Sequence, residues 1–142
     1  MKRIAVLLLC GLAAVSLVPA APAAIKITKI YFDSPGADTG SNTSLKAEWI
    51  RLKNTGSKGK YLTGWTIRDT AGHVYRFGTY KLGAGKTVTV HTGSGSNSAG
   101  HRYWGSDWYV WNNDGDKARL KNKAGTLIDS CSYSGAGDYV NC

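Results

Sequence analysis

Aromatic side chains crowd residues 103–111, where five of the nine residues are Trp or Tyr. On a strand, successive side chains alternate between faces, so Trp108 and Val110 would share one face and Trp111 would point to the other. A two-layer sandwich buries one face of each strand, so we expect one aromatic set at the rim. An exposed ring stacks on sugars or on nucleobases. The candidate binding residues of this segment are Trp104, Trp108 and Trp111; the alternative is that they cap the end of the core.

Basic residues form a second candidate site. The chain has 18 Lys and Arg against 9 Asp and Glu, a formal net charge of +9. In residues 48–54, alternation places Trp49, Arg51 and Lys53 on one outward face. Cations attract anionic polymers, and a neighbouring aromatic ring adds stacking. We therefore expect these three residues to bind nucleic acid or an acidic cell-wall glycopolymer, with poor specificity because no base-reading helix is evident. The alternative is that the charge serves solubility alone.

Residues suited to catalysis or metal binding do not form a recognised motif. The serines of residues 93–96 lack the Gly-x-Ser-x-Gly elbow of a hydrolase. His73, His91 and His101 match no metal spacing, although a site of three histidines brought together by folding stays open. Residues 112–116 resemble half of a calcium loop without its remaining ligands. We predict no enzymatic activity, no metal site and no cofactor; whether calcium binds stays open.

The N-terminus has the order of a secretory signal peptide. Lys2 and Arg3 precede an apolar run too short to span a bilayer, and an A-x-A-like cleavage site ends at Ala23. We expect residues 1–23 to be removed and residues 24–142 to form one secreted, extracellular domain without stable membrane insertion. Loss of Lys2 and Arg3 lowers the formal net charge from +9 to +7.

Cleavage would also remove Cys10 and leave two cysteines, Cys131 and Cys142. In an oxidising compartment an even number of cysteines indicates a disulfide. The alternatives are two free thiols or a metal pair, but a metal needs more ligands than two cysteines. We predict a Cys131–Cys142 bond that contributes about 2–3 kcal/mol in the chain-entropy description.

Short strand-like runs separated by turn residues make up the rest of the sequence, which has 18 glycines. This pattern predicts an all-β, immunoglobulin-like sandwich of about eight short strands. The expected strands are residues 25–32, 47–54, 64–69, 74–80, 87–92, 108–112, 117–121 and 126–133, with a long loop at 34–44. Asp114-Gly115 predicts a hairpin between the sixth and seventh strands. Glu48 shares the parity of Ile50 and Leu52, so it points inward and needs a partner.

Three segments resemble the lamin tail domain family in its bacterial secreted form. They are residues 48–54 (EWIRLKN), 62–69 (LTGWTIRD) and 110–120 (VWNNDGDKARL). Weaker matches extend the resemblance from about residue 25 to residue 133, and their order and spacing make it specific. The resemblance implies an immunoglobulin-like domain that serves as a binding or scaffolding module and has no catalytic residues of its own.

Two classes of function follow. The first is a secreted, non-catalytic binding or structural module that recognises an anionic polymer. The second is a protein–protein or cell-surface scaffold, and in either case we expect a monomer; a small secreted hydrolase is the least supported. The distribution of charge separates the first two, because convergence on one face favours polymer binding and scatter favours a scaffold. The residues to compare are Lys46, Arg51, Lys53, Lys58, Lys60 and Arg68.

Overall fold

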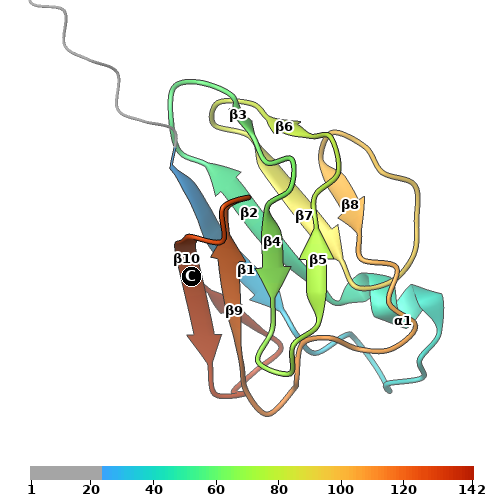
Figure 1. Ribbon diagram of the computed structural model, residues 1–142. Coiled ribbons are helices and arrows are strands. Elements are labelled where there is room, and N and C mark those ends of the chain that lie inside the picture. Colours follow the sequence, from blue (N-terminus) through green and yellow to red (C-terminus); the bar gives the residue numbers. More distant parts are fainter. Residues whose placement is uncertain (1–23) are drawn as a thin grey trace, which may run out of the picture.

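Strands with alternating apolar side chains form two sheets that pack face to face (Figure 1). The computed structural model describes residues 24–142, so the predicted signal peptide lies outside the described residues. In spatial order, the five-stranded sheet contains β11 (Tyr139–Asn141), β1 (Ile25–Tyr31), β2 (Trp49–Asn54), β7 (Thr87–His91) and β8 (His101–Tyr103). The four-stranded sheet contains β10 (Leu127–Tyr133), β9 (Asp116–Lys121), β4 (Thr66–Arg68) and β5 (Val74–Arg76). A small sheet pairs β3 (Lys60–Tyr61) with β6 (Lys81–Leu82), and a short helix, α1 (Asn42–Ala47), precedes β2.

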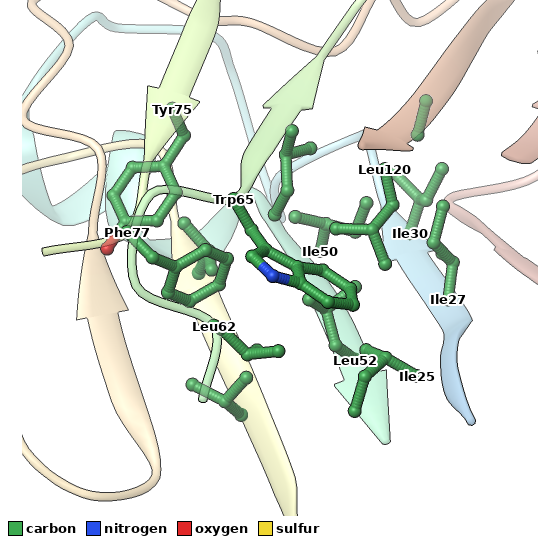
Figure 2. Packing of buried hydrophobic residues seen from close by; sticks show 14 of the residues in the cluster. Ile25, Ile27, Ile30, Ile50, Leu52, Leu62, Trp65, Tyr75, Phe77 and Leu120 are labelled. Atoms are coloured by element: carbon green, nitrogen blue, oxygen red, sulfur yellow. The ribbon is translucent and has the colours of Figure 1, made fainter. Parts of the chain in front are cut away.

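The core lies between the two large sheets, as the period-two pattern predicted. Ile50 and Leu52 of β2 are fully buried, and Ile67 and Leu120 face them from the four-stranded sheet. Figure 2 shows Trp65 between the Tyr75–Phe77 pair and the aliphatic side chains of β1 and β2. The all-β, immunoglobulin-like sandwich is therefore confirmed. No helix within residues 24–142 is long and apolar enough to cross a membrane.

The predicted hairpin is wrong, because residues 108–112 do not form a strand. A turn is present, with the Gly115 amide donating to the Asn112 carbonyl at 3.4 Å, and it leads directly into β9. A type I′ turn needs positive φ at both central residues, but every described residue with positive φ is a glycine, which excludes Asp114. β9 instead pairs with β10 and β4.

Other differences from the expected elements involve short segments. The described residues contain eleven strands rather than about eight, and β3, β6, β8 and β11 have two or three residues each. Such strands are too short to show alternation, and β11 is stabilised by pairing with β1. The expected loop at 34–44 contains the first half of α1, and the helix continues to Ala47 in the expected strand 47–54. The helix begins after Ser41, whose hydroxyl accepts from the Ser44 amide as an N-cap.

Glu48 connects β2 to the segment before β9. Its side chain is fully buried, and Oε1 accepts hydrogen bonds from the Thr92 hydroxyl at 2.6 Å and from the Val110 and Trp111 amides at 2.8 and 3.2 Å. The predicted need for buried partners is therefore confirmed. Burial raises the pKa of Glu48 from its ordinary 4.5 to about 7, against the opposing effect of these hydrogen bonds.

The predicted disulfide between Cys131 and Cys142 is confirmed, with a Cα–Cα distance of 5.8 Å. Cys131 lies on β10, at the edge of the four-stranded sheet, and Cys142 follows β11, at the edge of the five-stranded sheet. The bond therefore joins the two layers at one side of the sandwich. The Asp129 carboxylate reinforces this side, because it accepts a hydrogen bond from the Ile27 amide at 2.9 Å.

Candidate binding surface

Five aromatic side chains form a row across the outer face of the five-stranded sheet. Strand register places Tyr139 beside Tyr31, Tyr31 beside Trp49, Trp49 beside His91, and His91 beside Tyr103. One residue thus comes from each of β11, β1, β2, β7 and β8. The row arises because equal parity on adjacent strands directs side chains to the same face. None of the five side chains is buried.

Stacking between neighbours fixes the orientation of these rings. The ring centroids of Tyr31 and Trp49 are 5.5 Å apart, those of Tyr31 and Tyr139 are 5.9 Å apart, and those of His91 and Tyr103 are 5.0 Å apart. All three pairs have interplanar angles of 25° or less. The ring faces therefore contact one another, and ring edges are the part left for a ligand. The stacking on a ligand that the sequence predicted for Trp49 is therefore restricted, because Tyr31 and Arg51 cover its ring.

A cationic row borders the aromatic row on the same face. Lys29 pairs with Arg51, and Lys26 pairs with Lys53 across β1 and β2. The Arg51 guanidinium lies 4.6 Å from the centroid of Trp49, and Lys29 Nζ lies 3.4 Å from that of Tyr139. The five strands of this sheet contain no Asp or Glu. The structure thus places Trp49, Arg51 and Lys53 on one face, as the sequence predicted.

Two histidines lie at the β7–β8 end of these rows. His91 Nδ1 is 2.7 Å from the Lys46 carbonyl oxygen, which can only accept, so Nδ1 carries a proton. His91 Nε2 is 3.0 Å from His101 Nδ1. Burial is the main cause that lowers the pKa of His91 below 6.5, with further contributions from the nearby charges of His101, Lys46 and Arg51. In the free domain His91 is therefore mainly neutral near neutral pH.

The three tryptophans expected from residues 103–111 have different environments. Trp111 is 1 % exposed, so its proposed role as a surface contact is wrong. Trp104 is half-buried and packs against Tyr75 and Trp111 with ring centroids 5.8 and 6.1 Å away. Trp108 is 60 % exposed. Strand alternation did not apply, because this segment is irregular and tertiary packing decides which ring faces solvent.

The six basic residues chosen for comparison do not gather on one face. Arg51 and Lys53 lie on the outer face of the five-stranded sheet, where Lys26 and Lys29 join them. Arg68 lies on the outer face of the four-stranded sheet, opposite Arg119 of β9. The remaining three, Lys46, Lys58 and Lys60, lie in α1, the β2–β3 turn and β3. This scatter favours a scaffold by the criterion stated above. In favour of polymer binding, Lys26, Lys29, Arg51 and Lys53 share one outer face, which is also the face that carries the described aromatic row.

The remaining acid–base groups have clear structural roles. His73 Nδ1 is 2.6 Å from Asp69 Oδ2, and Asp69 Oδ1 accepts from the Gly72 and His73 amides, which fixes the β4–β5 turn. Asp116 is buried and accepts from the Thr70, Asn112 and Lys117 amides. Within residues 24–142, no group of three or more His, Cys, Asp or Glu side chains is arranged to hold a metal ion.

The immunoglobulin-like sandwich and its polar, aromatic outer face define a binding or structural module. The family model of the Lamin Tail Domain matches residues 18–135. The chain therefore belongs to the lamin tail domain family, whose members are immunoglobulin-like, non-enzymatic modules. No curated protein sequence matches the chain.

Proposed function

We propose that this domain is a secreted module that binds an anionic polymer on the outer face of its five-stranded sheet. The observation that carries the proposal is the pairing of Lys26 with Lys53 and of Lys29 with Arg51, without an acidic residue in any strand of that sheet. Like charges directly opposite each other on a sheet are destabilising, so a ligand that neutralises them is favoured.

The shape of this surface suits an extended polymer. The cationic pairs run along β1 and β2, and the aromatic row crosses them at the Tyr31–Trp49 pair. The Trp49 indole NH and the hydroxyls of Tyr31, Tyr103 and Tyr139 are hydrogen-bond donors at the ring edges, and phosphate and carboxylate oxygens accept such bonds. Nucleic acid and acidic cell-wall glycopolymers both carry these oxygens at regular intervals.

The disulfide supports a location outside the cytoplasm, because such bonds persist in oxidising compartments. Together with the predicted signal peptide, it favours an extracellular module. A protein–protein or cell-surface scaffold is the alternative, and it takes the place of the polymer proposal if the basic face binds no polyanion.

The test compares two double charge reversals of equal size. Arg51→Glu with Lys53→Glu changes the proposed face, and Arg68→Glu with Arg119→Glu changes a cross-strand pair on the opposite face. We would measure binding to single-stranded DNA, duplex DNA and a teichoic-acid-like polymer over a range of salt concentrations. The first variant should weaken binding by about tenfold or more at low salt, and the wild-type affinity should fall steeply as salt rises.

The second variant should lose less than about threefold, because long-range attraction alone is affected. Equal losses in the two variants would show that only the net charge matters and would remove the assignment to the five-stranded sheet. Absence of wild-type binding at low salt would contradict polymer binding as a whole.

A further inference from the structure

The exposed Trp108 lies at one end of the sandwich, beside a pocket that the basic face does not include. The pocket has a volume of about 280 Å³ and is lined by Asp38, Trp108, Tyr109, Trp111, Asn112 and Asn113. This is close to the lower end of the usual range for small-molecule sites, about 300–1,000 Å³, and matches a ligand the size of one sugar ring. The lining combines an exposed aromatic ring with carboxylate and amide groups.

Glycine packing holds the Trp108 ring in place. A Cβ on Gly40 would lie 2.5 Å from Trp108 Cζ3, and Gly40 has a φ of +67°, so a glycine is required under this ring. One side of the indole therefore rests on the Gly40 backbone, while the side chain as a whole remains 60 % exposed. Ser106 Oγ donates to the Trp108 carbonyl at 2.7 Å and fixes the local backbone.

Neighbouring side chains are also fixed before any ligand arrives. The Tyr109 hydroxyl is 2.5 Å from Ser44 Oγ and accepts from the Gly40 amide at 3.3 Å. Asn113 Nδ2 donates to Asp38 Oδ2 at 3.3 Å and to Asp33 Oδ1 at 3.2 Å. These bonds orient a carboxylate and a carboxamide beside the indole, and preorganisation lowers the entropy cost of binding.

Charge at this end disfavours an anionic ligand. Residues 32–45 and 103–116 contain five acidic residues, namely Asp33, Asp38, Asp107, Asp114 and Asp116, and no Lys or Arg. Phosphate or uronate groups would be repelled by Asp33 and Asp38, which contact the pocket's Asn113. Neutral hydroxyl groups, in contrast, donate well to carboxylate oxygens and to a carboxamide oxygen such as Asn113 Oδ1, since both Asn113 Nδ2 hydrogens already bond to Asp33 and Asp38.

We propose that the Trp108 pocket binds a neutral pyranose, with the indole against the apolar face of the sugar and with Asp38 and Asn113 taking its hydroxyls. The site stands independently of the polyanion proposal, because its residues, its charge and its position differ from those of the basic face. A module with both sites would hold a glycan through neutral sugars as well as through acidic groups.

The test uses neutral sugars at a salt concentration that suppresses polyanion binding. We would titrate the domain with methyl glucoside, methyl galactoside and tetra-N-acetylchitotetraose and follow saturation-transfer NMR and amide shifts. At least one sugar should bind saturably, and Trp108→Ala should weaken it by about tenfold. Trp108→Phe, which keeps an aromatic ring, should retain part of the affinity.

Tyr61→Ala is the matched control, because Tyr61 is 62 % exposed and lies on β3, outside the pocket. It should bind sugar as the wild type does, and so should Arg51→Glu with Lys53→Glu. Asp38→Asn should reduce the preference for methyl glucoside over glucuronate, since it removes the repelling charge. The proposal is overturned if none of the sugars binds saturably. It is also overturned if folded Trp108→Ala keeps the wild-type affinity, or if Tyr61→Ala loses as much affinity as Trp108→Ala.

Discussion

The basic face and the Trp108 pocket use aromatic side chains in opposite ways. On the five-stranded sheet, Trp49 is covered by Tyr31 and by the Arg51 guanidinium, and cations dominate the surface that remains. At the Trp108 pocket, the indole rests on glycine and stays largely exposed, and the nearby charges are carboxylates. An aromatic residue therefore offers a ring face to a ligand only where its neighbours leave that face uncovered.

Backbone geometry is the origin of this contrast. Adjacent strands in register bring residues of equal parity to about 5 Å from each other, so aromatic residues on a sheet face stack on one another. An irregular segment imposes no such spacing, and residues 104–115 direct Trp111 inward and Trp108 outward within one short stretch. Substitutions at Glu48, His91 and Lys53 test whether the two regions behave differently, in addition to the charge reversals and the sugar titration.

The largest expected effect concerns Glu48, which joins the two regions by preceding Trp49 and accepting from the Val110 and Trp111 amides. Because burial raises its folded-state pKa to about 7, its contribution to stability is complete below about pH 4.5 and is lost as the pH rises through 7. Between about pH 4.5 and about pH 7, the free energy of unfolding of the wild type should therefore fall by about 3 kcal/mol relative to that of Glu48→Gln. Chemical denaturation of both proteins across this pH range measures the difference.

The matched variant for this position is Glu48→Ala, which also removes the acceptor. Without this acceptor the Val110 and Trp111 amides lose their hydrogen bonds, so sugar binding at the Trp108 pocket should weaken. Polymer binding should stay unchanged when the wild type and the variant are compared at the same fraction of folded protein. Equal pH profiles for the wild type and Glu48→Gln would contradict the raised pKa of Glu48.

A smaller effect is expected from His91 on the basic face. Burial depresses the pKa of His91 in the free domain, whereas a bound polyanion favours the charged imidazolium and raises that pKa. Binding to single-stranded DNA should therefore tighten by about threefold between about pH 7.5 and about pH 5.5, because DNA phosphodiesters do not titrate there.

Loss of the imidazoles should remove this pH dependence. His91→Asn with His101→Asn is the test variant, and His73→Asn, whose ring pairs with Asp69, is the control that should keep it. Sugar binding at the Trp108 pocket should not show the same increase. Retention of the full effect without His91 and His101 would assign it to another group.

The smallest effect is a gain in stability from relieving like charges. Lys53 lies directly opposite Lys26 on β1, so Lys53→Gln should stabilise the domain by about 0.5 kcal/mol and weaken polymer binding at the same time. Lys58→Gln, in the exposed β2–β3 turn, is the control and should leave stability unchanged. Urea denaturation measures both, and destabilisation by Lys53→Gln would show that the Lys26–Lys53 pair is not strained.

Much of the sandwich was predictable because period-two patterning reports directly on burial in a strand. The inward positions of Ile50, Leu52, Trp65 and Ile67 follow from alternation, and so does the shared outward face of Trp49, Arg51 and Lys53. The hairpin before β9 was not predictable in this way. Asp114-Gly115 is compatible with several turns, and the amides of Val110 and Trp111 bond to the Glu48 side chain rather than to a strand.

The amino-acid sequence was sufficient for the fold class, the disulfide partners and the parity of the β2 residues. The first and third depend on local periodicity, and the second depends on the two cysteines that lie after the predicted signal peptide. Tertiary structure alone decided which residues of distant strands form rows, since Tyr31, Trp49 and His91 are neighbours only through strand pairing. It also decided that Trp108 lies over Gly40 and that Trp111 is buried. The physical reason is that these positions depend on contacts between segments far apart in the chain, which local propensity does not specify.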